Sequence, residues 1–310
     1  MPARSSRAQA GPPDRGGVLV VDKPAGPTSH DVVALVRRRL HGAKVGHTGT
    51  LDPFATGVLP LVVGRATRLA RYLGGGDKEY DATIRLGRAT DTHDITGRVV
   101  FEAPATAPLP SQEAVRAVLG TFRGTWLQKP PAFSAKMAAG VRAYEHARRG
   151  ESVELAPVPV TVSRLEMLSM EHSLVRVRLV SSAGFYVRAF AHDVGDRLGV
   201  GACLEALRRT RSGTFALEDA VTLDRLAQPG LEARMILLET LLADWPVVLL
   251  TAEGTAWVGH GRDLGPSQYR GDARAGSHEG LVRIVGPDGL LAGIGEISAG
   301  GVLHPSVVLV

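Results

Sequence analysis

The chain has little of what would mark a disulfide framework, a zinc site or a membrane protein. It contains one cysteine in 310 residues, Cys203, so it can form no intrachain disulfide and cannot supply the paired thiolates of a structural zinc site. No apolar run approaches the roughly 18 residues that a membrane-spanning helix needs. We therefore expect a cytoplasmic protein that does not enter a membrane.

The sequence also lacks the short motifs of metal and phosphate chemistry. It has no H-E-x-x-H pair and no P-loop, and its ten histidines show no ligand spacing. Residues 91–97, DTHDITG, lack the terminal glutamate of a calcium loop, so we expect them to form a turn between two strands. Neither a metal nor a cofactor is predicted. Residues 1–16 are polar and rich in Pro and Gly, without the apolar centre of a secretory signal, and are expected to be a disordered tail.

The net charge of +5 and the pI of about 9.6 favour a polyanionic partner such as a nucleic acid. Each basic cluster taken alone is typical of a solvated helix face. Three such clusters on one basic chain leave the nucleic-acid interpretation and the ordinary one evenly balanced. The clusters are Arg37, Arg38 and Arg39; Arg148 and Arg149; and Arg208 and Arg209 with Arg211.

The hydrophobic pattern indicates strands, helices and one long loop before residue 246. Four segments with apolar runs or strict alternation are expected to be strands: 17–26, 57–64, 78–87 and 172–182. Six segments are expected to contain helices, the first of them capped by Thr28 or Ser29: 29–40, 65–73, 111–122, 141–150, 184–199 and 231–245. Residues 128–140 are rich in Pro and Ser and are expected to form a loop of the length that tends to be functional.

The composition and the hydrophobic pattern of the sequence change near residue 246. Residues 246–310 combine many glycines with short Val, Leu and Ile runs, and strong helical periodicity disappears. We therefore predict a small all-β module after a larger domain over residues 17–245.

A single carboxylate, Asp52, lies in a stretch with unusual backbone, AKVGHTGTLDPFATG (43–57). Glycines such as Gly49 let the backbone approach a ligand closely. Pro53 fixes its own φ and restricts Asp52 to an extended conformation, so the carboxylate would point in one direction. These features alone leave open whether Asp52 is catalytic or forms a turn.

A reactive carboxylate in a cleft needs a nearby cation, because burial raises its pKa and a guanidinium lowers it. Arg188, in the apolar and aromatic stretch GFYVRAF, is a candidate partner. An arginine in such a stretch needs a fixed anion nearby, unless its head group reaches solvent. Both alternatives stay open at this point.

Five blocks of the sequence, in this order and at these spacings, resemble the tRNA pseudouridine-55 synthases of the bacterial TruB type. The blocks are GVLVVDKPAGPTSHD, VGHTGTLDPFATGVLPLVVGRATRL, KEYDATIRLGRATDTHDITG, QKPPAFSA with GVRAYEHARRGE, and SSAGFYVRAFAHDVGDRLGVGACLEALRRTRSG. The resemblance covers residue 17 to the C-terminus. It implies an α+β fold, with a central, largely antiparallel mixed sheet flanked by helices in residues 17–245. The segment GLLAGIGEISAGGVLHPSVVL resembles a PUA-type RNA-binding module, which implies a small β-barrel in residues 246–310.

The resemblance also assigns site residues, position by position. The family's catalytic aspartate falls on Asp52, its active-site tyrosine on Tyr80 and its carboxylate-pairing arginine on Arg188. The substrate-binding positions fall on His47, Gly49, Leu207, Tyr186 and Lys23, the last followed by Pro24 of the first motif. One position departs from the family pattern: Met137 stands where a lysine is usual, and Lys136 precedes it, so a phosphate contact there is in question.

The implied reaction is the isomerisation of a uridine in the T loop of tRNA to pseudouridine, without metal or cofactor. The resemblance implies that the uridine is flipped out of the T loop, that the T arm and acceptor stem bind the basic surface, and that a monomer acts without an obligatory protein partner. Asp52 could attack the sugar or stabilise its positive charge, and Tyr80 could stack on the base or accept a proton. Three alternatives are an RNA-binding or RNA-folding protein, a synthase acting on ribosomal RNA or directed by a guide RNA, and a glycosidase-like enzyme, for which no second acid is evident.

Overall fold

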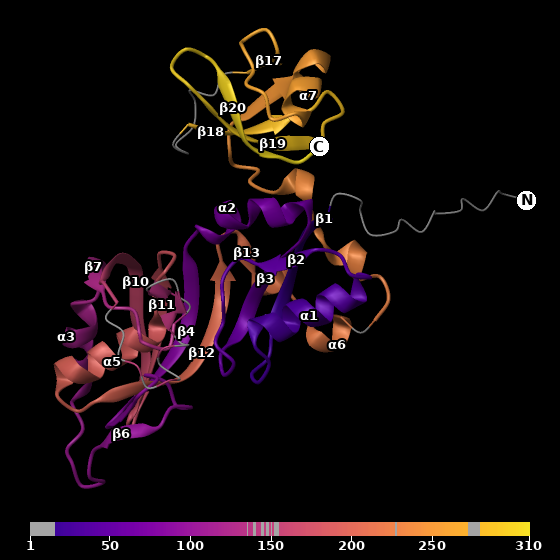
Figure 1. Cartoon of the computed structure of the whole chain (residues 1–310). Coiled ribbons are helices and arrows are strands. Elements are labelled where there is room, and N and C mark those ends of the chain that lie inside the picture. Colours follow the sequence, from indigo (N-terminus) through magenta and orange to yellow (C-terminus); the bar gives the residue numbers. More distant parts are fainter. Residues whose placement is uncertain are drawn as a thin grey trace, which may run out of the picture.

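The computed structural model describes residues 16–134, 136–138, 141–143, 146, 149, 151, 155–226, 228–271 and 280–310. In this part of the chain, an eleven-stranded sheet and a five-stranded sheet form two bodies, with the smaller one at the C-terminal end (Figure 1). The predicted tail lies outside the described residues except for Gly16, which begins the first strand. None of the described helices is long and apolar enough to cross a membrane.

The large sheet is mixed and largely antiparallel, as predicted. Its main path runs β14 (Val221–Thr222), β1 (Gly16–Lys23), β3 (Thr56–Gly64), β12 (Ala202–Ser212), β4 (Lys78–Leu86), β11 (Leu174–Ser181), β10 (Val158–Glu171) and β7 (Gly124–Gln128). Three short strands pair beside this path: β2 (Val45–His47), β13 (Phe215–Ala216) and β15 (Ile236–Leu237). Only the pairs β1–β14 and β3–β12 are parallel.

Helices flank this sheet at sites that the sequence largely predicts. The described α-helices of this part are α1 (Ser29–Arg39), α2 (Ala70–Gly74), α3 (Gln112–Gly120), α5 (Val187–Leu198) and α6 (Leu223–Leu226), and α7 (Ala252–Gly259) lies in the C-terminal body. The 3₁₀ turns are η1 (Arg65–Leu69), η2 (Leu217–Asp219), η3 (Leu231–Arg234) and η4 (Leu238–Thr240). Two hairpins complete the elements: β5 (Arg88–Thr90) with β6 (Val99–Glu102), and β8 (Met137–Ala138) with β9 (Val141–Arg142).

Strand β4 forms the middle of the core because its side chains alternate as predicted. Tyr80, Ala82, Ile84 and Leu86 are buried, and they belong to the same apolar cluster as Phe190 of α5. Figure 1 shows α3 and α5 lying against this part of the sheet. The central strand of the large sheet therefore carries a predicted site residue, Tyr80, on its buried face.

Two helix predictions are wrong in part. The segment 231–245 contains no α-helix: it forms η3, β15 and η4, because Ile236 and Leu237 pair with the edge of β1. The segment 141–150 begins as strand β9, but its described residues Ala143 and His146 are helical, as predicted. In the parts that are extended, pairing with a neighbouring strand overrides local propensity.

The C-terminal body is not all β and is not a closed barrel within the described residues. Its sheet runs β17 (Tyr269–Arg270), β16 (Val247–Leu250), β18 (Leu281–Val285), β19 (Leu291–Ile297) and β20 (Leu303–Val308), and α7 packs beside it. The Thr251 hydroxyl caps the N-terminus of α7. The many glycines of this region made this capping residue hard to recognise in the sequence.

The two bodies share an apolar cluster and polar contacts. Ile294 and Leu309 pack in one cluster with Val20 of β1 and Leu69 of η1. Arg65 donates a hydrogen bond to the carbonyl of Leu309. Arg68 donates one to the carbonyl of Val308, the last residue of β20. The small sheet therefore packs against η1 and against the strands of the large sheet that lie next to the Asp52 loop.

Candidate active site

The loop that carries Asp52 is held by side chains from outside it. The Ser29 hydroxyl accepts from the Leu51 amide at 2.9 Å and donates to the Leu51 carbonyl at 3.0 Å. The Asp52 carbonyl accepts from the Ala55 amide at 3.1 Å. The Pro53 carbonyl accepts from Lys23 Nζ at 3.1 Å. These hydrogen bonds hold the carbonyls of Leu51, Asp52 and Pro53 one after another. The Asp52 carboxylate therefore projects from a rigid backbone.

Asp52 and Arg188 form the ion pair that the sequence predicts. Arg188 Nε lies 2.9 Å from Oδ2 of Asp52, and Arg188 Nη2 lies 3.3 Å from Oδ1, so the contact is two-pronged. The guanidinium also donates to the carbonyls of Thr92 at 2.9 Å and Phe133 at 2.8 Å. The Arg188 side chain is 7% exposed and that of Asp52 is 33% exposed, so a ligand can reach the carboxylate while the cation stays behind it.

Local structure at α5 explains how Arg188 reaches this position. Tyr186 is the N-cap of α5 and Arg188 the second helical residue, and the helix ends at Gly199 in a left-handed conformation. The buried amide of Gln128 binds both backbone groups of Tyr186, accepting from its N–H at 2.8 Å and donating to its carbonyl at 2.9 Å. The start of α5, and with it the Arg188 side chain, is therefore fixed to strand β7.

The electrostatics of Asp52 oppose its ionisation more than the sequence argument assumed. Burial raises the pKa of Asp52 above its ordinary value, and the Arg188 guanidinium opposes that shift. Asp94 raises the pKa of Asp52 further, and Lys23 lowers it. Arg188 therefore limits the rise in pKa but does not reverse it.

Asp94 is a site residue that the sequence interpretation missed. It belongs to the DTHDITG turn, and its Oδ2 lies 3.7 Å from Arg188 Nη1. Its Oδ1 accepts from the amide of Thr96 at 3.0 Å and from the hydroxyl of Thr92 at 3.0 Å. The segment is a turn between strands, as predicted, but it also brings a second buried carboxylate to Arg188. The two flanking threonines were the available signal, because such hydroxyls bind an aspartate locally.

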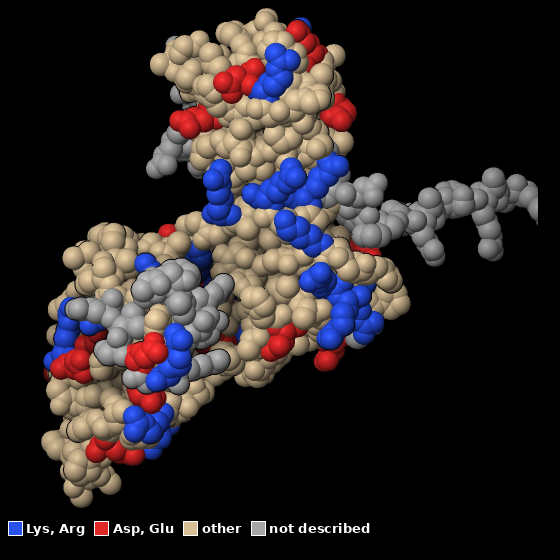
Figure 2. Space-filling view, viewed as in Figure 1, with Lys and Arg blue, Asp and Glu red and all other residues tan. Residues whose placement is uncertain are grey.

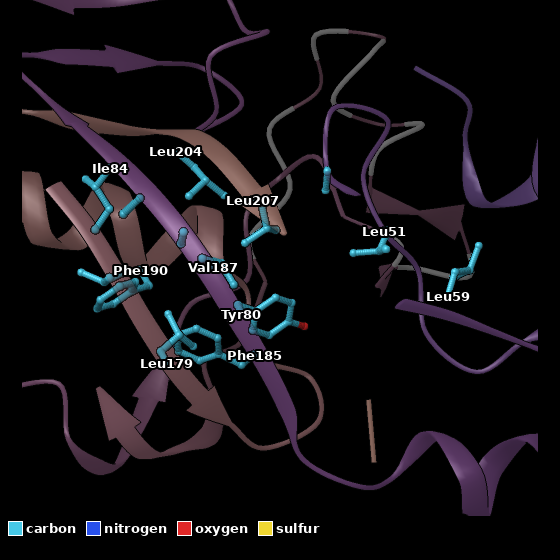
Figure 3. Close-up of a cluster of buried hydrophobic side chains, with 14 of the residues drawn as sticks. Leu51, Leu59, Tyr80, Ile84, Leu179, Phe185, Val187, Phe190, Leu204 and Leu207 are labelled. Atoms are coloured by element: carbon cyan, nitrogen blue, oxygen red, sulfur yellow. The ribbon is translucent and has the colours of Figure 1, made fainter. Parts of the chain in front are cut away.

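Tyr80 and Leu207 lie together on adjacent strands. Both are buried in the cluster that includes Leu51 of the Asp52 loop. Figure 3 shows the Tyr80 ring beside Leu207, with its hydroxyl directed towards the side on which Leu51 lies. Tyr186 is also close to the ion pair: burial raises the pKa of its phenol, while the neighbouring Ser134 and the charge of Arg188 oppose the shift.

Lys23 is fully buried beneath the Asp52 loop. Its Nζ donates to the carbonyls of Pro24 at 2.8 Å, Pro27 at 2.9 Å and Pro53 at 3.1 Å. Burial lowers the pKa of Lys23 to about 8, and the charge of Asp52 opposes the shift. The geometry makes Lys23 an anchor of the loop.

The remaining positions that the resemblance names lie in strands β2 and β8 and in the loop before Asp52. His47 ends β2, where its ring meets that of His30 edge-on with centroids 6.0 Å apart. Gly49 has no left-handed φ, and its carbonyl accepts a hydrogen bond from Arg209 at 3.0 Å. Met137 begins β8, whose partner strand begins at Val141.

The predicted basic cluster at Arg208, Arg209 and Arg211 is wrong for Arg209. Its side chain is buried, because alternation along β12 turns it to the inner face. Arg208 points the other way and pairs with Asp22 at 2.8 Å, with 41% of its side chain exposed. Arg209 therefore cannot contact an RNA phosphate.

Exposed cations gather elsewhere on the surface. Figure 2 shows them where the two bodies meet and again over the region of α1. The elements there supply Arg65, Arg68 and Arg71 from η1 and α2, and Arg37, Arg38 and Arg39 from the last turn of α1. Arg149 of the remaining cluster is exposed, and Arg148 lies outside the described residues. Such a surface suits a polyanion.

The arrangement supplies a half-exposed carboxylate, a buried guanidinium behind it and an aromatic ring. It can stabilise or attack a carbon that develops positive charge, with a flat apolar group held against Tyr80 and Leu207. Within the described residues, no group of three or more His, Cys, Asp or Glu side chains is placed to hold a metal ion.

Comparison with known proteins gives matches along almost the whole chain. Three family models match consecutive segments: "TruB family pseudouridylate synthase (N terminal domain)" over 37–187, "tRNA pseudouridylate synthase B C-terminal domain" over 188–244 and "Pseudouridine synthase II TruB, C-terminal" over 246–309. The tRNA pseudouridine synthase B of Solibacter usitatus is 43% identical over 94% of this chain and 99% of that protein. That of Thermobifida fusca is 44% identical over 92% of this chain and 95% of that protein.

Two solved structures with the same fold come from multi-component complexes. A Cbf5 chain in a Cbf5–Nop10–Gar1 complex is 28% identical, with a TM-score of 0.73, over 96% of this chain and 85% of that one. A chain of an H/ACA RNP bound to a substrate RNA containing 2′-deoxyuridine is 27% identical, with a TM-score of 0.71, over 96% of this chain and 86% of that one. Together with the family models and the bacterial relatives, these matches show that the chain belongs to the TruB family of pseudouridine synthases.

Proposed function

We propose that this protein isomerises uridine to pseudouridine at position 55, in the T loop of tRNA, with Asp52 as the reacting carboxylate and no cofactor. The observation that carries the proposal is the two-pronged contact between Asp52 and Arg188, with the carboxylate on the exposed side. The bacterial relatives with 43% and 44% identity, which are named tRNA pseudouridine synthase B, support tRNA as the substrate.

In the proposed reaction, the bond between N1 of uracil and C1′ of the ribose breaks and a bond from C5 to C1′ forms. The proton on C5 leaves, and N1 gains one, so no atoms are added or lost overall. Asp52 acts at the sugar, either by attacking C1′ or by stabilising its positive charge while a sugar proton leaves. Arg188 keeps the carboxylate aimed.

Tyr80 and Leu207 form the platform for the detached base. The buried ring of Tyr80 stacks on uracil while the base turns, and its hydroxyl is the candidate acceptor for the C5 proton. Leu207 supports the ring from the neighbouring strand, and the two side chains share one apolar cluster. This platform keeps uracil from leaving between the two bond changes.

A uridine stacked in a folded T loop cannot reach Asp52, so the enzyme flips it out, which costs a few kcal/mol. His47 fills the space that the nucleotide leaves. The exposed arginines offset part of the cost through phosphate contacts remote from the chemistry. We assign catalysis to a domain of residues 17–245 and acceptor-stem binding to a PUA-like domain of residues 246–310, preceded by a tail over residues 1–16.

The test is to incubate the purified protein alone with unmodified tRNA transcript and to map new pseudouridine by sequencing. One new pseudouridine at position 55 is expected, and none in a control transcript with cytidine at that position. Modification at other uridines, or none at all, would contradict the proposal.

The second candidate is a synthase directed by a guide RNA, which the likeness to a chain of an H/ACA RNP and to a Cbf5–Nop10–Gar1 complex favours. Those chains are 27% and 28% identical to this one, below the 43% and 44% of the bacterial relatives. The stand-alone assay separates the two candidates, because a guided enzyme needs added RNA before it modifies any transcript.

A further inference from the structure

Arg209 is the large buried cation for which neither the ion pair nor the RNA surface accounts. Its side chain is 2% exposed. Burial lowers the pKa of Arg209, and the nearby Tyr80 phenol opposes that shift. A guanidinium carries five donors and no acceptor, so its burial is tolerated only where oxygens surround it.

The acceptors of Arg209 lie around the Asp52 loop. Nη2 donates to the carbonyl of Gly49 at 3.0 Å, and Nη1 reaches the carbonyl of Thr50 at 3.4 Å. Nε donates to the carbonyl of Val58 in β3 at 2.7 Å. One planar group thus binds the loop before Asp52 and the strand after it.

Arg209 completes the anchoring of the loop. Leu51 is held by Ser29 and Pro53 by Lys23, whereas the carbonyls of Gly49 and Thr50 are bound by Arg209. Without Arg209, the N-terminal half of the loop would lose its described side-chain anchor.

Arg209 also links the loop to the base platform. Tyr80 lies directly opposite Arg209 in the pairing of β4 with β12. Directly opposite residues of paired strands project to the same face of the sheet, so the Arg209 guanidinium and the Tyr80 phenol lie side by side. The same side chain therefore anchors the Asp52 loop and borders the Tyr80 ring.

The fold admits Arg209 through a close approach of two strands. Gly57 of β3 pairs with Arg209 in the parallel contact of β3 with β12. Its φ is +102°, and a Cβ there would lie 2.1 Å from the Arg209 carbonyl oxygen. A glycine is required at this point, which places the Arg209 backbone directly behind the loop.

We propose that Arg209 is a positioning residue that sets the Asp52 carboxylate and the Tyr80 hydroxyl relative to each other. The proposal rests on the proposed function, because it assigns these two groups to one reaction. Arg209 acts through the loop backbone and touches no substrate. Its loss should lower the rate of the chemical step and leave tRNA binding in place.

The test compares R209M and R209K with R85A and the wild type. Arg85 is a matched control, because it joins the same two strands through a pair with Glu205 at 2.6 Å and lies outside the proposed site. Single-turnover rates are measured at saturating tRNA, with tRNA dissociation constants and thermal unfolding of each variant. Hydrogen exchange of the amides in residues 50–55 is measured without RNA.

We expect R209M to lower the single-turnover rate about 100-fold, the scale of a misplacement near 1 Å, with the dissociation constant changed less than about threefold. R209K should retain more of the rate, because it keeps the charge and some of the bonds. Exchange at 50–55 should quicken in R209M and not in R85A. A single-turnover rate of R209M within threefold of the wild type overturns the proposal. So does a loss of rate that is explained by weaker tRNA binding or by unfolding of the variant.

If R209M does not fold, R209K decides. A folded R209K with a reduced rate and unchanged affinity supports the proposal, and a wild-type rate overturns it. A wild type that makes no pseudouridine would refute the proposed function instead. The exchange measurement would then still decide whether Arg209 anchors the Asp52 loop.

Discussion

The two sheets of the molecule bury different kinds of side chain. The large sheet and its loops bury four cations and a carboxylate: Lys23, Lys78, Arg188, Arg209 and Asp94. Among the described residues of the C-terminal body, Gln268 is the buried polar side chain, and the rest of its core is apolar. The large sheet therefore buries charged groups beside an apolar core, whereas the core of the C-terminal sheet is apolar.

This difference locates the chemistry without reference to any relative. Burying a charged group is unfavourable unless partners surround it. In the large sheet, Lys23, Arg188 and Arg209 gather around the loop of residues 49–53, and such a concentration of buried charge is typical of a functional site. Lys78 instead donates to the carbonyls of Gly74 and Gly76, outside that loop. The C-terminal sheet accepts no such cost, which suits a body that holds a ligand by its surface.

The largest effect should come from the carboxylate itself. D52N is expected to lower pseudouridine formation at least about 10⁴-fold, as loss of a nucleophile does in other enzymes. The tRNA dissociation constant should stay within about tenfold, equivalent to about 1.4 kcal/mol. Single-turnover assays and filter binding measure both. Activity near that of the wild type would end the assignment of Asp52, and equal tRNA refolding by D52N and the wild type would show a separate folding role.

Removal of the partner guanidinium should have the next largest effect and should change the pH profile. Burial raises the pKa of Asp52 and Arg188 opposes the rise, so R188A should raise that pKa further. Because the proposed reaction uses the ionised carboxylate, the rate of R188A should fall on the acid side at a higher pH than in the wild type. The loss at neutral pH should be about 10²–10³-fold, the effect of deleting one charge-stabilising donor.

Rates between pH 5 and 9 test this prediction, with thermal unfolding as a check on folding. R85A, which removes an arginine from a surface pair on the same sheet, should keep the wild-type profile. An R188A rate that does not change between pH 6 and 9 would count against the pairing argument.

A substitution in the apolar core of the C-terminal body should lower the free energy of unfolding and leave the reaction rate almost unchanged. Ile284 is fully buried in the C-terminal apolar cluster, so I284A is expected to lower the free energy of unfolding by about 2–5 kcal/mol. Its single-turnover rate at saturating tRNA should remain within about threefold of the wild type, or about 0.7 kcal/mol. Denaturant titration and rate measurements below the transition test both. A large loss of rate would erase the contrast between the two sheets.

The smallest effect concerns a histidine pair beside the ion pair. His93 stacks on His192 with ring centroids 4.0 Å apart, and Arg188, Asp94 and Asp91 are the other charged groups near it. Burial is the main cause that lowers the pKa of His93 to about 4. The unfolded chain binds this proton more tightly, so the free energy of unfolding should fall as the pH drops from about 6.5 to about 4, by up to about 3 kcal/mol.

The variant H93N should lack this part of the pH dependence. The φ of His93 is +64°, a conformation that asparagine tolerates well. His172 is a matched control, because it is exposed and has a φ of +52°. H172N should keep the wild-type slope. Equal slopes for H93N and the wild type would show that His93 does not carry the effect.

Local sequence rules predicted the parts of the site that depend on local structure. The alternation of β4 put Tyr80 on the inner face, and Thr28 caps α1 as one of two candidates. The position of Arg188 in an apolar stretch indicated a nearby anion, and the structure identifies Asp52 as that anion. The family resemblance connected these residues, since no rule of spacing links positions so far apart.

Register and pairing decided what the sequence could not. Arg208 and Arg209 are neighbours in the chain, and only the register of β12 tells which one is buried. Asp94 is buried because it bridges to Leu204 of β12, a contact that no local pattern reveals. Residues 231–245 have helical spacing, but pairing with the β1 edge makes part of them extended.

The pairing of β3 with β12 has a consequence for the order of events during protein synthesis. Asp52 leaves the ribosome 136 residues before its partner Arg188, and Gly49 leaves 160 residues before Arg209. Closing such long loops is slow relative to forming local structure. A nascent chain that ends before β12 therefore still lacks the Arg209 anchor of Gly49 and Thr50, and the proposed site is completed only in the last third of translation.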